Sequence, residues 1–230
     1  MARPPRQLLD GGCYHVIARG NNRQFLLNEE TAFRYFLDLL GRAKVRYPAK
    51  LYHYCLMSNH IHMLLEIGEG AHLPKFMQLV LQGYARWYGK RQRYSGHVWQ
   101  GRYKSPLVSQ GSYYLEAGRY IERNPLRAKL VTDLNDYPWS SYPTYAYGRA
   151  NPLVDEDPYY VPLGPTLTHR QAAYRDFVRL ESPYAPLLDN SRSRWTASAG
   201  RTPLNSQQLT RKVTYIFDGP QCNFLFRPET

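Results

Sequence analysis

The sequence of 230 residues is poor in cysteine, in long apolar runs and in acidic residues. Its three cysteines, Cys13, Cys55 and Cys222, are far apart and form no Cys-x-x-Cys pair, which argues against a disulfide framework and a structural zinc site. No apolar run approaches the roughly 20 residues of a membrane span. Residues 1–6 are followed by no apolar signal core. We therefore expect a cytoplasmic protein without a membrane segment.

Acidic residues are outnumbered by basic ones, 18 against 30, so the formal net charge is +12. A chain this basic usually binds a polyanion, most often nucleic acid, although a ribosome-associated or membrane-surface protein would carry a similar charge. The sequence has no P-loop and no acidic metal triad. These absences argue against an ATP-driven motor and against a transposase of the acidic-triad type.

Hydrophobic periodicity predicts the order strand, helix, strand, strand, helix, strand. The predicted ranges are 12–20, 28–47, 51–57, 60–67, 73–90 and 97–108. This order is typical of ferredoxin-like (RRM-like) domains, so we predict an α+β fold whose antiparallel sheet carries both helices on one face. A third helix, from Ser112 to about Asn124, is then expected on the other face. Residues 1–147 should form this domain, and residues 148–230 a proline-rich, partly helical C-terminal extension.

Two histidines occupy alternate positions in the strand at 60–67. His60 and His62 share the face opposite an apolar row, and side by side they could reach one metal ion. The alternative is a pair of surface histidines on an edge strand. The apolar row consists of Ile61, Met63, Leu65 and Ile67.

A tyrosine and an amide are neighbours on one face of the third predicted helix. Tyr120 and Asn124 are four residues apart, which places them on the same side. Pro125 disfavours helical geometry at Asn124, so the amide should lie near the helix end. Because Tyr120 is one of 21 tyrosines, a core position is the ordinary interpretation of this residue alone.

Two segments suit contact with single-stranded nucleic acid. The polar loop at 21–24 could bind phosphates or bases, or could be a plain turn. Arg102 and Lys104 share a strand face beside aromatic rings, a combination that favours a nucleic-acid track, although such edge strands exist without ligands.

Three motifs together carry a family resemblance: Asn59-His60-Ile61-His62, Trp99-Gln100-Gly101-Arg102-Tyr103-Lys104 and Arg119-Tyr120-Ile121-Glu122-Arg123-Asn124-Pro125. They resemble the single-tyrosine HUH transposases, and most of all the REP-associated tyrosine transposases, over roughly residues 12–142. The resemblance implies Tyr120 as nucleophile, His60 and His62 as catalytic metal ligands, and Asn124 as the third ligand. Asn instead of Gln at position 124 matches the REP-associated group better than the insertion-sequence branch.

The implied activity is metal-dependent nicking and rejoining of single-stranded, hairpin-bearing (REP-like) DNA through a covalent 5′-phosphotyrosine. A tyrosine hydroxyl, with a pKa of about 10, is a poor nucleophile at neutral pH, and a divalent cation can offset the charge that builds on the phosphate. Two imidazoles and an amide leave open positions that suit Mg²⁺ or Mn²⁺. The competing hypotheses are a non-catalytic single-stranded nucleic-acid-binding module and a metal-dependent phosphodiesterase that uses water.

Further expectations concern the partners. A monomer in which Tyr120 completes its own chain's site is favoured, with a dimer as the alternative, because the insertion-sequence branch swaps this helix between subunits. The expected location is the cytoplasm, in association with the nucleoid. Seven residues, some of them within the motifs, are expected to contact DNA: Arg19, Asn21, Arg23, Arg102, Lys104, Arg119 and Arg123.

Overall fold

The computed structural model describes residues 8–108 and 113–180. Contacts divide the chain into two units, Met1–Ser182 and Pro183–Thr230, and the described residues all belong to the first. Residues 148–180 were assigned to the C-terminal extension from the sequence, and the structure places them in the same unit as the sheet. Residues 148–180 belong to the first unit because they pack on its helices and on its sheet.

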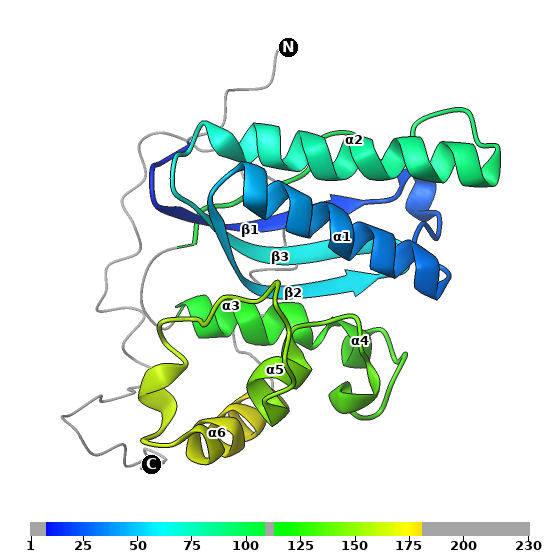
Figure 1. The fold of residues 1–230 in the computed structure, drawn as a ribbon. Helices are drawn as coiled ribbons and strands as arrows, with labels where there is room; N and C mark the ends of the chain where they lie inside the picture. The colour runs from blue at the N-terminus through cyan, green and yellow to red at the C-terminus, as the bar shows by residue number, and fades with distance from the viewer. Residues whose placement is uncertain (1–7, 109–112, 181–230) are drawn as a thin grey trace, which may run out of the picture. The chain divides into compact units, whose positions relative to one another are not determined.

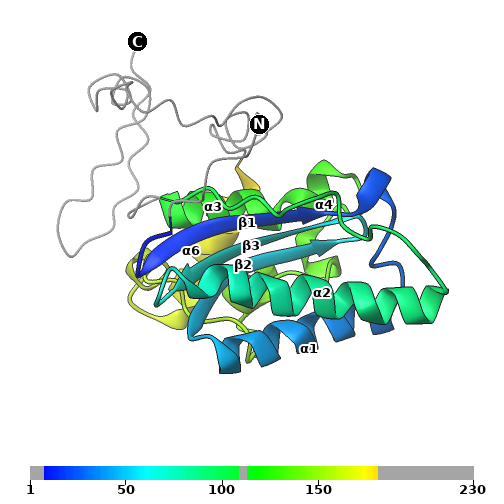
Figure 2. The same ribbon diagram turned by 90° about the horizontal axis from the view of Figure 1, so that it is seen from above.

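The described residues form an α+β fold in which helices cover both faces of an antiparallel sheet (Figures 1 and 2). Helices α1 and α2 lie on one face, and α3 to α6 lie on the other. This arrangement confirms the predicted fold class. The elements are β1 (Gly12–Arg19), η1 (Asn21–Arg23), α1 (Glu30–Arg46), β2 (Ala49–Met57), β3 (His60–Ile67), α2 (His72–Gln92), α3 (Tyr113–Glu122), α4 (Asn124–Arg127), η2 (Leu134–Asp136), α5 (Tyr142–Tyr147), η3 (Val161–Leu163) and α6 (Leu167–Arg179).

Strand β3 lies between β1 and β2, and its alternating side chains separate the core from the site. In an antiparallel pair, residues directly opposite each other share a face. Val16 and Tyr54 both lie opposite Met63, and all three are buried in the core beneath α1 and α2. The apolar row of β3 is completely buried, as expected for the face that packs on the helices: Ile61, Met63, Leu65 and Ile67.

The segment predicted as a fourth strand, 97–108, lies along the outer edge of β1 but is not a continuous strand. Isolated antiparallel bridges join it to β1, one of them between Lys104 and Ile17. Gly101 adopts a left-handed conformation with φ of 73°, and Pro106 has no N–H to donate. These two residues interrupt the hydrogen-bonded ladder, so the position of the segment was predicted correctly but its regular pairing was not.

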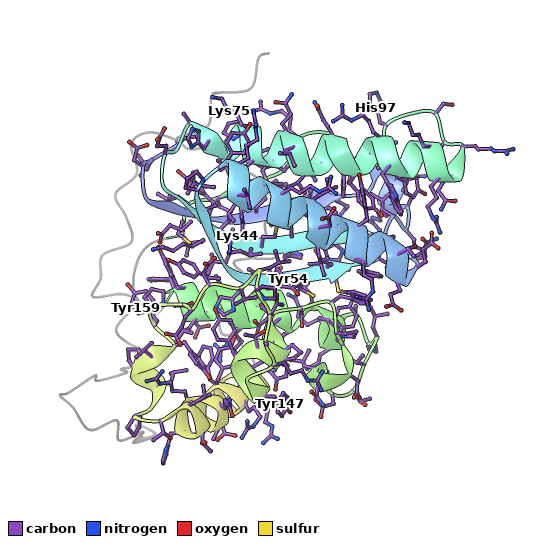
Figure 3. All side chains as sticks on the ribbon, in the orientation of Figure 1. Lys44, Tyr54, Lys75, His97, Tyr147 and Tyr159 are labelled. Atoms are coloured by element: carbon purple, nitrogen blue, oxygen red, sulfur yellow. The ribbon has the colours of Figure 1, made fainter. Side chains whose placement is uncertain are left out.

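Residues 151–157 are attached to the layer of α1 and β2. Lys44 of α1, labelled in Figure 3, forms an ion pair with Asp155 and donates to the carbonyl of Leu153 (2.8 Å). The Asp155 carboxylate also accepts a hydrogen bond from the N–H of Leu51 (2.7 Å).

Across residues 8–108 and 113–180, no helix is long and apolar enough to cross a membrane.

A fully buried histidine joins β2 to the helices on the open face of the sheet. Next to a bulge in β2, His53 places Nδ1 2.9 Å from Glu122 Oε1 and Nε2 3.0 Å from Asp157 Oδ2. Glu122, the last residue of α3, also accepts from Ser141 Oγ (2.5 Å) and Tyr174 Oη (2.7 Å). Burial alone would lower the pKa of His53, but the hydrogen bonds to Asp157 and Glu122 raise it to about 9. The imidazole is therefore charged at neutral pH.

This raised pKa predicts a loss of stability in alkaline solution. The folded protein keeps the His53 proton to a higher pH than the unfolded chain, in which histidine titrates near pH 6.5. The stabilisation is fully present below about pH 6.5 and is lost as the pH rises through about 9, with a linkage contribution of about 3 kcal/mol. We expect His53→Gln to reduce the free energy of unfolding at pH 6 and to flatten its dependence on pH.

Denaturant unfolding at a series of pH values between about 6 and 10 measures this effect. His97→Gln is the matched control, because His97 is exposed on the loop beyond α2 (Figure 3). The control should keep the pH dependence of the natural chain. Parallel stability curves for the natural chain and His53→Gln would contradict the prediction.

Candidate active site

The histidine pair of β3 and the tyrosine of α3 meet on the open face of the sheet. The rings of His60 and His62 have centroids 5.0 Å apart, and the ring of Tyr120 lies edge-on to His62 at 5.9 Å. Tyr120 is 4% exposed and His62 is 5% exposed, so both rings are covered, whereas His60 is half-buried. The structure thus brings the two histidines together with Tyr120, which lies 60 residues after His60 in the sequence.

Asn124 lies where α3 ends and α4 begins, as the position of Pro125 predicted. Its Nδ2 donates to the carbonyls of Tyr120 (3.1 Å) and Ile121 (2.9 Å), which are among the last carbonyls of α3. These bonds use both donors of the side-chain amide and leave its oxygen as the remaining polar atom. The Asn124 side chain also lies within hydrogen-bonding distance of His60. The fourth expected member of the site is therefore present.

Each histidine of the pair has its Nδ1 atom engaged by a neighbour. His60 Nδ1 lies 2.6 Å from Asn59 Oδ1, and His62 Nδ1 lies 2.9 Å from Nε2 of the buried His15. An amide oxygen only accepts, so Nδ1 of a neutral His60 carries the proton and Nε2 keeps its lone pair. If His62 Nδ1 donates to His15, the Nε2 atom of His62 keeps its lone pair in the same way. In this tautomer both imidazoles present a metal-binding nitrogen.

The histidines of the site are neutral at physiological pH. Burial lowers the pKa of His15 to about 4, and burial together with the charge of Arg19 lowers the pKa of His60 to about 4. The pKa of His62 is held well below its usual value by burial and, next in size, by His15. Arg127 contributes in the same direction to both His60 and His62. Unprotonated imidazoles are the form that binds metal ions.

The donor set fits a small divalent cation that keeps open coordination positions. In the described part of the chain, no three His, Cys, Asp or Glu side chains are grouped so that they could hold a metal ion. The candidate set contains two such side chains, His60 and His62, and its third donor is the amide oxygen of Asn124. Neutral nitrogen and oxygen donors of this number suit Mg²⁺ or Mn²⁺ with water or phosphate in the other positions.

Two residues of the site, His15 and Arg127, were not identified from the sequence. His15 alternates with Tyr14 and Val16, which are core residues, so its position in the strand pattern already placed it on the histidine face. The side chain of Arg127 lies over the ring of Tyr120, with Cζ 4.6 Å from the ring centroid. The separation of seven residues between the two is a helical repeat. The strand alternation and the helical spacing were both visible in the sequence, but neither pattern specifies which side chains are in contact.

Most of the cations expected to contact DNA lie on the surface around β1. Arg19 is exposed at the end of β1, directly opposite His60 in the register of the sheet. Two more of the expected DNA contacts lie in η1, the half-buried Asn21 and the exposed Arg23. Arg102 and Lys104 are exposed on the segment that lies beside β1. We call these five residues the basic edge.

The other two arginines point to α6 instead of the surface. Arg119 is 2% exposed, with its guanidinium 4.3 Å from the ring of Phe177 and bonded to the Phe177 carbonyl (3.2 Å). Arg123 donates to the carbonyls of Val178 (2.6 Å) and Arg179 (2.7 Å). Cations are favourable at the C-terminal end of a helix, where carbonyls lack partners. These residues attach α6 to α3, so their guanidinium groups are engaged within the fold.

Comparison with known proteins agrees with the fold and with the family resemblance. The sequence model of the family described as "Transposase IS200 like" matches residues 10–124, half of the chain. A Haemophilus influenzae protein assigned to the REP-associated tyrosine transposases is 24% identical over 154 residues, which are 62% of this chain and 86% of that protein. A solved structure of a REP-associated tyrosine transposase bound to a REP hairpin has the same fold, with a TM-score of 0.54 and 19% identity over 68% of this chain and 93% of that one. This chain therefore belongs to the IS200-like transposase family and is similar to its REP-associated tyrosine transposases.

Proposed function

We propose that this chain nicks and rejoins single-stranded, hairpin-bearing (REP-like) DNA through a covalent 5′-phosphotyrosine on Tyr120. The observation that carries the proposal is the convergence of Tyr120, His60, His62 and Asn124 on one face of the sheet. A binding module would not require this combination. The family membership and the hairpin-bound structure of a relative support DNA as the substrate.

In the proposed reaction, Tyr120 Oη attacks the phosphorus of one phosphodiester. The P–O bond to the 3′-oxygen breaks, the tyrosine loses its proton, and the leaving oxygen gains one to become a 3′-hydroxyl. The 5′-phosphate then remains bonded to the tyrosine. Attack by another 3′-hydroxyl reverses the chemistry and joins two strands without nucleotide hydrolysis.

His60, His62 and Asn124 would hold the divalent cation, Mg²⁺ or Mn²⁺. When bound, such an ion offsets negative charge on the non-bridging phosphate oxygens. Asn59 and His15 contact the Nδ1 atoms of the two histidines and fix the orientation of each ring, and with Nδ1 of His62 protonated both Nε2 atoms would keep a lone pair for the ion. The basic edge would bind the DNA backbone leading to the site.

Tyr120 is proposed to serve the site of its own chain, as a monomer in the cytoplasm acting on nucleoid DNA. The contacts of α3 support this assignment. Its last residue, Glu122, is bonded to His53 of β2 in the interior of the same chain. Exchange of the helix between subunits would have to re-form this buried ion pair between two chains, since a buried charge left without its partner is costly.

The first prediction of this proposal concerns Tyr120→Phe. Hairpin oligonucleotides from repeats that flank the protein's own gene, labelled at the 5′ or the 3′ end, are incubated with the protein and Mg²⁺ or Mn²⁺. We expect 3′-side label in a protein-sized band on a denaturing gel, reduced more than about a thousand-fold by Tyr120→Phe because the nucleophile is missing. DNA affinity should not change.

Tyr113→Phe is the matched control, since Tyr113 is 41% exposed at the start of the same helix. It should form the adduct at the normal rate. Adducts that persist in Tyr120→Phe would refute the assigned nucleophile. Cleavage without any protein-bound label would favour the phosphodiesterase that uses water, and binding without cleavage would favour the nucleic-acid-binding module.

The second prediction concerns the metal. His60→Ala and His62→Ala should each abolish Mn²⁺ binding, measured by electron paramagnetic resonance, and should abolish cleavage as EDTA does for the natural chain. His169→Ala, which changes an exposed histidine at the start of α6, should leave both unchanged. Cleavage that continues in EDTA would contradict a role for the ion.

The third prediction concerns His15, a positioning residue. His15→Leu removes the partner of His62 Nδ1 and should weaken Mn²⁺ binding by about 10- to 100-fold. His15→Gln provides an amide oxygen that can accept from the same Nδ1–H, so it should restore part of the affinity. Equal Mn²⁺ affinities for the Leu variant and the natural chain would show that His15 only fills space.

A further inference from the structure

An exposed cation covers the proposed nucleophile. Arg127 is the last residue of α4, one turn after Asn124, and its guanidinium carbon lies 4.6 Å from the centroid of the Tyr120 ring. Its charge also acts on His60 and His62, next to the larger effect of their burial. Arg127 therefore shares one site with the tyrosine, the two histidines and Asn124.

The electrostatics of this site favour an anion. The charged side chains that act on both His60 and His62 are cationic, Arg19 and Arg127. Arg19 lies beside His60 in the sheet, and Arg127 lies beside Tyr120. The two exposed guanidinium groups thus border the site from the β1 side and from the α4 side.

The position of Arg127 over the ring suits the recognition of a phosphate. A guanidinium contacts an aromatic ring through its face, whereas its N–H donors point outward in the plane of the group. Such donors match the non-bridging oxygens of a phosphate and form strong, charge-assisted hydrogen bonds. A phosphodiester placed for attack by Tyr120 would lie next to this guanidinium.

We propose that Arg127 is a catalytic residue whose guanidinium binds a non-bridging oxygen of the phosphodiester that Tyr120 attacks. The inference rests on the proposed function. Arg127 forms and breaks no covalent bond. It donates hydrogen bonds to the substrate phosphate, to the more highly charged transition state and then to the phosphotyrosine, and the bond to the transition state is the strongest.

The competing explanation is that Arg127 only packs on Tyr120 and keeps its ring in place. Three substitutions separate the two roles. Arg127→Met keeps the packing and removes the charge, Arg127→Gln keeps shorter hydrogen-bonding groups, and Arg127→Lys keeps the charge without the planar fork. Lys129→Gln, two residues farther along, is the matched control for the loss of one exposed positive charge.

The first measurement is the single-turnover rate of phosphotyrosine formation at saturating DNA. We expect Arg127→Met and Arg127→Gln to lower the rate by about 10- to 100-fold, Arg127→Lys to lower it less, and Lys129→Gln to stay within about twofold. Thermal unfolding midpoints should be unchanged for all four variants, because both side chains are exposed. A rate for Arg127→Met equal to that of the control would overturn the proposal.

The second measurement needs neither metal nor catalysis. In EDTA and a Tyr120→Phe background, the affinity is measured for hairpin DNA in which the scissile phosphate is a neutral methylphosphonate. Neutralisation should cost about tenfold in affinity when Arg127 is present and little in Arg127→Gln, whereas the same change two nucleotides away should affect both equally. Equal losses in both backgrounds would show that Arg127 does not contact this phosphate.

The two proposals fail in different ways. If the natural chain forms no phosphotyrosine with any flanking hairpin, the proposed function is wrong. If the adduct forms and Arg127→Met reacts as fast as Lys129→Gln, the proposed function stands and only the role of Arg127 is wrong.

Discussion

The position of the tyrosine helix depends on the buried ion pairs of His53 with Glu122 and Asp157. Glu122 ends α3 two residues after Tyr120, and its carboxylate is bonded to donors from β2, from the turn before α5 and from α6. Buried ion pairs add little net stability, because desolvation offsets their attraction, but breaking one partner is costly. In this fold they hold α3 close against β2. The close approach also requires Gly118, where a Cβ would lie 2.7 Å from the His53 ring.

The residues after α3 complete this attachment. Arg119 and Arg123 hold the C-terminal end of α6, and Tyr174 of α6 reaches back to Glu122. Residues 148–180 are consequently part of what fixes Tyr120, and not an appendage to a finished domain. A site built from one helix and one strand needs such support, since small displacements between reacting groups lower the rate strongly.

The residues that local patterns could place were predicted correctly, and those placed by distant contacts were not. A period of two put His60 and His62 opposite the apolar row, and a separation of four put Tyr120 beside Asn124, because backbone geometry alone determines both relations. The bond from His15 to His62 depends on strand register, and the burial of Arg119 depends on α6. The charged His53 depends on two carboxylates far away in the sequence, and no local pattern indicates such a network. The irregular edge segment is the exception, because Gly101 and Pro106 are local signals of an interrupted strand.

The same packing delivers the nucleophile and sets the charge of the site. Burial is the largest cause of the low pKa values of His15, His60 and His62. Helix α3 and the start of α4 contribute to this burial. The ring of Tyr120 contacts His15 and His62, and the Asn124 side chain contacts His60. Undocking of this helix would therefore remove the tyrosine and allow the histidines to bind protons. With the helix docked, the donors are neutral and the exposed charges of Arg19 and Arg127 are directed toward one anionic substrate. In the proposed reaction, neutral metal ligands bordered by two cations would favour an anionic phosphodiester, and such a site would not need an acidic triad.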